Sequence, residues 1–220
     1  MRAHAAATGA VSARRLSLAA AALVTAAVLA IGVWRLVVGT GTATELAVYG
    51  SVPAFSLVER SGQTISSRDL AGRVWVADFI FTRCPGICPT LTTTLAALLR
   101  RLEERGMRHV TAVSISVDPA NDDPATLRRY ADRFGADPAR WLFLTGEEAA
   151  VTSLVRDGFK LGVASLPAGE RERAPEPITH SDRFVLVDAQ LRIRGYYHGT
   201  DADAVATLEK DLARLAKSDR

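Results

Sequence analysis

The sequence predicts an α/β domain built around a central sheet and preceded by a single transmembrane helix. From Val52 to the C-terminus, segments of strand length alternate with amphipathic segments, which is typical of a sheet with helical crossovers. Val74–Phe81, VWVADFIF, is almost continuously apolar, as expected for a strand buried on both faces. Leu16–Trp34 carries no charge and predicts a membrane anchor. A chain of 220 residues fits one domain plus such an appendage.

The N-terminal segment predicts a single-pass anchor. At about 1.5 Å per residue, the uncharged run from Leu16 to Trp34 nearly spans a hydrocarbon core of about 30 Å, and apolar residues continue to Val38. Arginines precede the run and no acidic residue occurs before Glu45, so the positive-inside rule keeps the N-terminus in the cytoplasm. We therefore expect a cytoplasmic segment at 1–15, an anchor at 16–38, a Gly/Thr/Ala-rich tether at 39–51 and a folded domain at 52–220.

Three other interpretations of this leader stay open. It is long for the apolar region of a cleaved signal peptide, although Thr42–Ala43 offers a small-residue cleavage site. Arg14–Arg15 weakly resembles a twin-arginine export signal, and acid-free leaders with arginine are also typical of mitochondrial targeting. Every interpretation places the folded domain outside the cytoplasm. The Ala/Arg-rich composition favours a bacterial inner membrane, with the domain in the periplasm.

The first half of the domain predicts a β-hairpin followed by strands and a helix. Two short strand-like segments flank the turn Ser61–Gly62 and form the hairpin. Leucines at helical spacing predict an amphipathic helix that ends at Gly106. In order, the expected elements are strands Ala54–Glu59, Gln63–Ile65 and Val74–Phe81, helix Thr90–Arg105 and strand His109–Val117.

The second half predicts alternating helices and strands and closes with a hairpin and a helix. Asn121 or Asp122 can cap a helix in which Pro124 occupies the first turn. Ala168–Pro177 is too charged and proline-rich to enter the core. The expected elements are helix Pro124–Phe134, strand Trp141–Leu144, helix Glu147–Asp157, hairpin strands Asp182–Asp188 and Leu191–Tyr197, and a helix capped by Asp201 that ends near Lys217. This order matches a thioredoxin-like fold with an added N-terminal β-hairpin.

The bulk charge argues against a nucleic-acid partner. The net charge is +3, with a pI near 9.1, but part of the excess lies in the leader and the rest is scattered. Nucleic-acid binding needs a basic face on the folded domain, and no segment provides one. Two cysteines are too few for a disulfide scaffold.

The two cysteines are close in sequence and indicate a chemical role. The loop FTRCPGICP places Cys84 and Cys88 between a buried strand and a helix start, where sites gather in open α/β sheets. The positive end of the helix dipole is expected to stabilise a thiolate there. Two thiolates with an imidazole would form a trigonal site for a soft cation, best Cu(I), and the same pair could instead cycle between dithiol and disulfide. A structural disulfide or two unrelated buried thiols is the less specific alternative.

A trigonal site needs a third ligand, and the chain has four histidines. His4 lies in the leader, and His109 is expected at the opposite edge of the sheet. His198 follows a strand, and the sequence leaves its position relative to the cysteines open. His180 precedes a strand in PITHSD, where a lone histidine is more often a polar loop residue than a ligand.

Three segments together resemble the Sco/SenC family. They are FTRCPGICP, SISVDPANDDPATL and THSDRFVLVD, in the order and spacing of that family. The resemblance runs from about Val52 to the C-terminus, and the combination of CxxxCP with a downstream His-Ser is specific. It implies a thioredoxin-like fold that binds copper, as Cu(I) and in some states Cu(II), with Cys84, Cys88 and His180 as the metal ligands.

The resemblance also implies a function. Family members are implicated in loading copper into the copper A centre of cytochrome c oxidase subunit II, and some are thought to reduce the cysteines of that centre. The chain is thus expected to be a membrane-bound metallochaperone, more an assembly factor than an enzyme, whose partners are subunit II and an upstream copper donor. A thiol–disulfide oxidoreductase is the alternative. A thiol peroxidase fits less well, because Phe81 and Pro85 stand where peroxiredoxins carry threonine.

Two features depart from the family pattern. Many members carry Asp between the cysteines where this chain has Gly86, which removes a carboxylate from the surroundings of the metal. The charged loop Ala168–Pro177 before His180 is long. Both features bear on copper affinity and preferred oxidation state more than on the identity of the ligands.

Overall fold

A computed structural model describes residues 22–34, 45–165 and 178–218 of the chain. The compact domain begins at Leu46, ahead of the predicted Val52. The reason is that the segment before Val52 is hydrogen-bonded to the sheet: Arg194 donates to the carbonyl oxygen of Leu46, and strand β1 (Gly50–Ser51) pairs with β10 (Arg192–His198).

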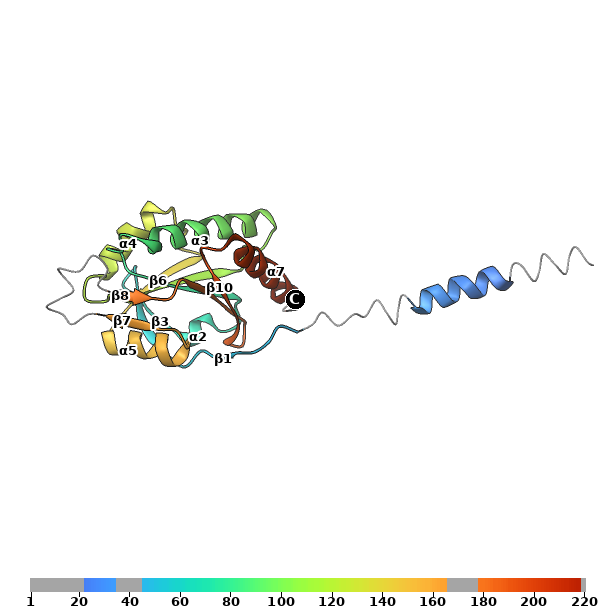
Figure 1. Cartoon of the computed structure of the whole chain (residues 1–220), viewed down its shortest axis with the longest axis horizontal. Coiled ribbons are helices and arrows are strands. Elements are labelled where there is room, and N and C mark those ends of the chain that lie inside the picture. The colour runs from blue at the N-terminus through green and yellow to red at the C-terminus, as the bar shows by residue number, and fades with distance from the viewer. Residues whose placement is uncertain (1–21, 35–44, 166–177, 219–220) are drawn as a thin grey trace, which may run out of the picture. The chain divides into compact units, whose positions relative to one another are not determined.

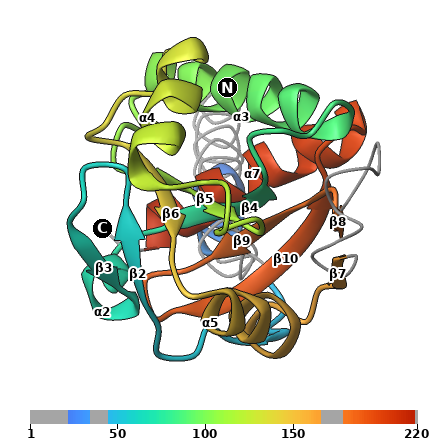
Figure 2. The same cartoon turned by 90° about the vertical axis from the view of Figure 1, so that its left-hand side faces the viewer.

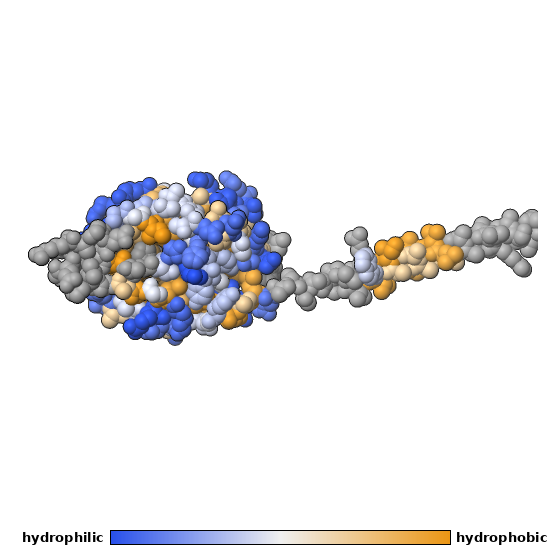
Figure 3. Space-filling view, in the orientation of Figure 1, coloured by the Kyte–Doolittle hydropathy of each residue, from blue (hydrophilic) through white to orange (hydrophobic). Residues whose placement is uncertain are grey.

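A separate helix occupies residues 22–34. Most of its side chains are apolar and all are exposed, as Figure 3 shows, and Leu23 is 72% accessible. Within the described residues, no helix combines the length and apolar character needed to cross a membrane. The predicted anchor at 16–38 extends at both ends into residues outside the described part, so a transmembrane helix stays a prediction.

The domain is built on an eight-stranded sheet in the order β1-β10-β9-β4-β5-β6-β2-β3 (Figure 1). The central strands β4, β5 and β6 are parallel, and β9 runs antiparallel beside β4. A separate two-stranded sheet joins β7 to β8. The further strands are β2 (Ser56–Glu59), β3 (Thr64–Ser66), β4 (Trp75–Ile80), β5 (Thr111–Ser116), β6 (Trp141–Thr145), β7 (Val163–Ser165), β8 (Ile178–His180) and β9 (Arg183–Val187).

Helices cover both faces of this sheet. Figures 1 and 2 show α3 and α4 on one face and α5 on the other. On the α5 side, the ring of Phe159 packs edge-on against Trp75 and Phe79 of β4. The helices are α2 (Ser67–Leu70), α3 (Ile87–Glu104), α4 (Pro124–Arg133), α5 (Glu148–Ser153), which continues as the π-helical turn η1 (Leu154–Gly158), and α7 (Ala202–Ser218).

The predicted thioredoxin-like architecture is confirmed. The leucines that predicted α3 form its buried face, with Leu95 and Leu98 fully buried against the sheet. All six residues of β4 are buried, as its apolar run requires. The predicted N-terminal hairpin is present as β2 and β3, and β2 adds to the sheet beside β6.

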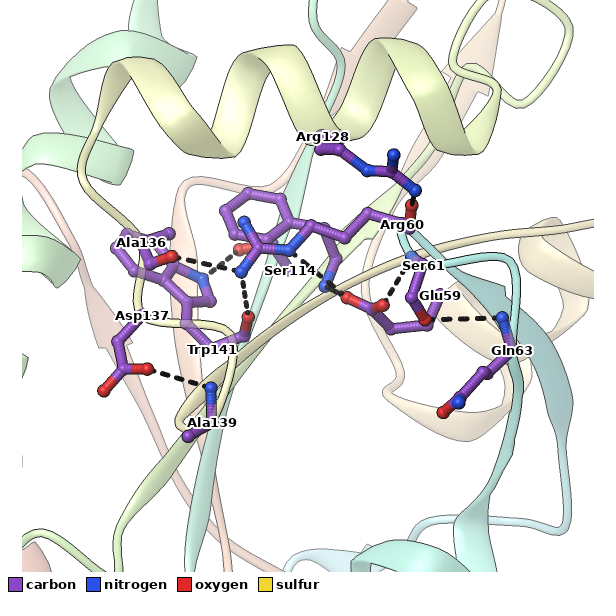
Figure 4. Close-up of polar contacts among 11 residues, drawn as sticks. Glu59, Arg60, Ser61, Gln63, Ser114, Arg128, Ala136, Asp137, Ala139 and Trp141 are labelled. Carbon is purple, nitrogen blue, oxygen red and sulfur yellow. Dashed lines mark hydrogen bonds and ion pairs between the residues drawn. The ribbon is translucent and has the colours of Figure 1, made fainter.

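A buried ion pair fastens this hairpin to the domain (Figure 4). The Glu59 carboxylate accepts a hydrogen bond from the N–H of Phe143 at 3.3 Å and lies 3.5 Å from the Arg60 guanidinium. Arg60 donates to the carbonyl oxygens of Ala136 at 3.1 Å and Trp141 at 3.4 Å. Because both charged side chains are almost fully buried, each depends on these partners to offset its lost hydration.

We expect Arg60→Ala to lower the free energy of unfolding by about 3 kcal/mol, because it leaves the buried Glu59 carboxylate without its counter-ion. Urea denaturation of the metal-free chain measures this loss. The matched control is Arg129→Ala, which removes an exposed arginine and should change stability by less than about 0.5 kcal/mol. Equal stability of the two variants would contradict the structural role of the pair.

Candidate metal centre

The two cysteines lie in the loop that follows β4 and in the first turn of α3. The Cys84 N–H donates to the Phe81 carbonyl oxygen at 3.2 Å, which forms a tight turn at the end of the strand. Gly86 is the N-cap of α3, and the helix begins at Ile87, earlier than the predicted Thr90. Cys88 therefore lies inside the first helical turn and is fully buried, whereas Cys84 is half-buried.

Neither cysteine forms a disulfide, and the two thiols interact with each other. Burial raises the pKa of the Cys88 thiol far above its usual range, and a hydrogen bond with the Cys84 thiol raises it further. A backbone hydrogen bond at Phe81 opposes this effect only in part. The expectation of a thiolate stabilised at the helix start is therefore wrong for Cys88, because burial raises the pKa of its thiol. Any metal that binds Cys88 must displace a proton.

A buried carboxylate holds the cysteine loop against the neighbouring strand. Asp122 accepts hydrogen bonds from the N–H of Thr82 at 3.0 Å and from its hydroxyl at 2.5 Å. A third hydrogen bond comes from the Ser116 hydroxyl of β5 at 2.6 Å. Burial raises the pKa of Asp122, while these hydrogen bonds lower it. Asp122 thus links Thr82, two residues before Cys84, to the end of β5. The motif SISVDPANDDP was the only sequence signal for this role.

A second carboxylate, that of Asp118, holds the segment just before Cys84. Asp118 is buried and accepts a hydrogen bond from the Arg83 guanidinium at 3.0 Å and from the side-chain amide of Asn121 at 2.8 Å. Arg83 directly precedes Cys84, and its side chain is half exposed. The ends of β4 and β5 therefore hold the backbone on the N-terminal side of Cys84 in place.

Asp78 lies beneath the cysteines on β4 and is fully buried. One of its oxygens accepts a hydrogen bond from the Ser114 hydroxyl at 2.5 Å, and the other has no hydrogen-bond partner among the described residues. Burial raises the pKa of Asp78 to about 7. Asp78 in turn raises the pKa of Cys88 by charge repulsion, in addition to the larger effect of burial.

We expect Asp78 to make the domain less stable as pH rises. The unfolded chain loses this proton near pH 3.9, whereas the folded chain holds it up to about pH 7, so the free energy of unfolding falls between these values by up to about 4 kcal/mol. Asp78→Asn should remove this part of the slope. Urea titrations of both chains at about pH 4, 6 and 8 measure it, and identical slopes would contradict the assignment.

His180 reaches the same edge of the sheet as the cysteines. It ends β8, where its backbone pairs with Val163 of β7, and it shortly precedes β9. Strand β9 is the immediate neighbour of β4, whose carboxyl end leads to Cys84. The His180 side chain and the loop Ala168–Pro177 lie outside the described part of the structure. Among the described side chains, no group of three Cys, His, Asp or Glu residues is placed to hold a metal. The three-ligand set therefore stays a prediction.

The other two histidines of the domain lie at opposite ends of the sheet. His109 is exposed in the turn before β5 and lines a cavity of about 500 Å³ with Arg73 and Arg108, far from the cysteine loop. His198 ends β10 and pairs in register with Arg183, at the edge where β4 ends. Sequence reasoning left the position of His198 open, because strand register decides it.

The described part of the site fits a soft cation. Two thiol sulfurs lie close together on a braced loop, one of them partly exposed, and thiolate ligands select Cu(I) over harder ions. No described carboxylate lies between the cysteines, where Gly86 stands.

Comparison with known proteins identifies the family. The model of the family described as SCO1/SenC matches residues 44–217. The chain belongs to the SCO1/SenC family. A SCO1 protein homolog of Bacillus subtilis is 32% identical over 151 residues, which cover 68% of this chain and 75% of that relative. The resemblance seen in the sequence is confirmed.

Solved structures of Sco proteins share the fold. BsSco, described as a Sco-family cytochrome c oxidase assembly protein with a disulfide switch, superposes with a TM-score of 0.66 at 28% identity and covers 78% of this chain and 97% of its own. ScoI of Bradyrhizobium japonicum with copper bound has a TM-score of 0.61 at 26% identity and covers 77% and 99% of the two chains. Copper is thus the metal seen in a solved structure of this SCO1/SenC fold.

Proposed function

We propose that this SCO1/SenC protein is a copper metallochaperone that binds Cu(I) through Cys84, Cys88 and His180 and delivers it to the copper A centre of cytochrome c oxidase subunit II. The observation that carries the proposal is the pair of neighbouring thiols at the start of α3, one buried and one accessible, on a loop held in place by Asp118 and Asp122. The copper-bound ScoI structure and the oxidase-assembly role of BsSco support copper as the cargo and the oxidase as the destination.

The two thiols differ in a way that suits transfer. Cys88 is buried in the first turn of α3, so an incoming ligand cannot approach it from solvent. Cys84 is partly exposed, and His180 is positioned by a short two-stranded sheet at the edge of the domain. A partner thiolate or imidazole would therefore replace His180 and Cys84 before Cys88. The low coordination number of a three-ligand copper site would leave room for this stepwise exchange.

Membrane attachment through 16–38 is part of the proposal. The uncharged leader and the arginines before it support an inner-membrane anchor that leaves the domain in the periplasm, where oxidase subunit II and a copper donor would meet it.

A thiol–disulfide oxidoreductase is the second candidate, favoured by the same pair of thiols. Cys84 and Cys88 would form a disulfide and pass two electrons and two protons to a disulfide of the oxidase, which would become a dithiol. The disulfide switch of BsSco supports this alternative. The raised pKa of Cys88 disfavours it, because exchange proceeds through thiolates.

One experiment separates the two functions. The full chain loaded with Cu(I) is incubated with a reduced, metal-free copper A domain of subunit II, and the metal-free chain is incubated with the oxidised domain. We expect copper to move to the reduced domain and the disulfide of the oxidised domain to persist. Cys84→Ser is the control that should transfer nothing. Reduction of the disulfide without copper transfer would establish the oxidoreductase instead.

A further inference from the structure

Two tyrosines and two basic residues gather around one surface cavity of the domain, close to where the leader joins it. The cavity measures about 430 Å³ and is lined by Tyr49, Lys160, Leu161, Arg183 and Tyr196. Tyr49 closely follows Leu46, where the compact domain begins, and is 59% exposed. Leu161 is almost fully buried and forms the apolar floor of the cavity. The other four residues form a tyrosine–cation surface.

The two tyrosine rings of this surface are held in place. Their centroids lie 5.7 Å apart in an edge-on contact between Tyr49 and Tyr196. The Tyr196 hydroxyl donates a hydrogen bond to the carbonyl oxygen of Phe159 at 3.0 Å, which fixes the ring on the α5 side of the sheet. A tyrosine combines an apolar ring with a polar tip, and such residues are enriched where a membrane meets water.

The two basic residues carry charge that the domain does not neutralise. In the part of the chain that the structure describes, neither Lys160 nor Arg183 forms an ion pair. Asp157 bonds the Arg156 guanidinium at 2.9 Å and 3.0 Å, and the attraction of Lys160 to it is smaller. The carboxylate of Asp182 holds a histidine ring instead. The cavity therefore offers two positive charges to an anionic ligand.

The backbone at Lys160 adds a second observation. Its φ of 58° lies in the left-handed region, which residues other than glycine seldom adopt. Glycine would fit this position without strain, yet the chain places a lysine there, whose side chain lines the cavity. Unusual backbone conformations of this kind concentrate at functional sites.

The length of the leader indicates what covers the surface. Eight residues separate Leu46 from Val38, the end of the predicted anchor, and an extended chain of that length spans at most about 28 Å. A short tether gives the domain an effective concentration in the millimolar range at the membrane that holds it. Two cations and two tyrosines would bind a free vesicle weakly, but they suffice for a tethered domain.

Resting on the membrane attachment proposed above, we propose that the tyrosine–cation surface docks the domain on the anionic phospholipid headgroups of the membrane that holds the anchor. Lys160 and Arg183 attract the lipid phosphates, and each cation strengthens such binding about fivefold. Tyr49 and Tyr196 lie at headgroup level. Because α3 covers the opposite face of the sheet (Figures 1 and 2), docking would leave the helix of Cys88 on the aqueous side.

The test measures how fast the lysines of the full chain are acetylated by a water-soluble succinimidyl ester. The chain is reconstituted in vesicles of phosphatidylcholine or of phosphatidylcholine and phosphatidylglycerol in equal parts. Mass spectrometry gives the labelling of Lys160 relative to Lys210, an exposed lysine of α7, which is ion-paired to α3 through Glu209 and Arg101. We expect this ratio to fall about fivefold in the anionic vesicles and to recover at high salt, which screens the attraction.

A matched pair of variants tests the charge on the surface. Arg183→Gln should remove most of the protection of Lys160 in the anionic vesicles, because one of the two cations is lost. It should leave the thermal unfolding temperature unchanged, since the Arg183 side chain has no ion pair within the described residues. Arg129→Gln removes an exposed arginine of α4, on the α3 side of the sheet, and should leave the protection intact.

Flotation of the vesicles in a density gradient separates this inference from the proposed attachment. If the chain floats with both kinds of vesicle and the labelling ratio is the same in both, the docking inference alone is overturned. Protection of Lys160 that arises only when a copper A domain is added would also overturn it, because the surface would then bind a protein. A chain that floats with neither kind of vesicle would overturn the proposed membrane attachment and the docking with it.

Discussion

Cys84→Ser is expected to lower the affinity for Cu(I) by roughly a hundred- to a thousandfold. Structural zinc sites with four ligands bind with about 10–16 kcal/mol, or about 2.5–4 kcal/mol for each ligand, and each 1.4 kcal/mol is a factor of ten in affinity. A serine hydroxyl is a hard, neutral donor that does not replace a thiolate for Cu(I). Competition against a Cu(I) chelator, together with the copper content after gel filtration, measures the loss.

The fold should survive this substitution. Cys84 is only half-buried, and the loop around it is held by Asp122 and Asp118 rather than by the thiol. The metal-free variant should therefore unfold at the temperature of the metal-free wild type. If Cys84→Ser kept full Cu(I) affinity, the thiols would not be the copper site, and a redox role for them would be the remaining explanation.

His180→Ala is expected to weaken Cu(I) binding roughly fiftyfold and to leave the fold intact. A neutral imidazole lacks the charge of a thiolate, so its loss belongs at the lower end of the range for one ligand, about 2.5 kcal/mol. The same chelator competition measures it. Because the two thiols remain, the variant should still bind copper, whereas Cys84→Ser should not retain it through gel filtration.

His109→Ala is the matched control for His180→Ala, since it removes a histidine at the opposite end of the sheet. It should leave the Cu(I) affinity unchanged. Equal affinities for wild type, His109→Ala and His180→Ala would remove His180 from the ligand set. A second chain with His180→Met tests ligation directly, because a thioether can bind Cu(I) and should restore part of the affinity.

Periodic apolar patterns carried most of the fold prediction. The buried run of β4 and the leucine stripe of α3 are both confirmed. In each, the element's own residues show which side is buried. Helix starts are less well determined, because capping geometry decides them: Gly86, with no side chain to signal a cap, begins α3 ahead of the predicted Thr90. The short strands β7 and β8 lack any such pattern and were not predicted as strands.

In the candidate site, too, the features set by nearby residues could be predicted and those set by long-range packing could not. A CxxxC spacing at a strand end located the thiols, since two nearby residues on one loop stay close in any fold. The protonation of Cys88 was predicted wrongly, because the burial that raises its pKa depends on packing from distant parts of the chain, and the charge of Asp78 on β4 raises it further. The position of His198 was open for the same reason, since a strand register between β9 and β10 sets it. His180 is placed by its backbone in β8, and its role rests on the family resemblance.

The Asp122 bridge between Thr82 and Ser116 affects how quickly the proposed copper centre can exchange its metal. A loop clamped to the next strand is preorganised: its conformational entropy is already lost when the chain folds, so closing it around an ion adds little to the barrier. In the proposed copper centre, the thiol side would therefore stay fixed while copper is exchanged.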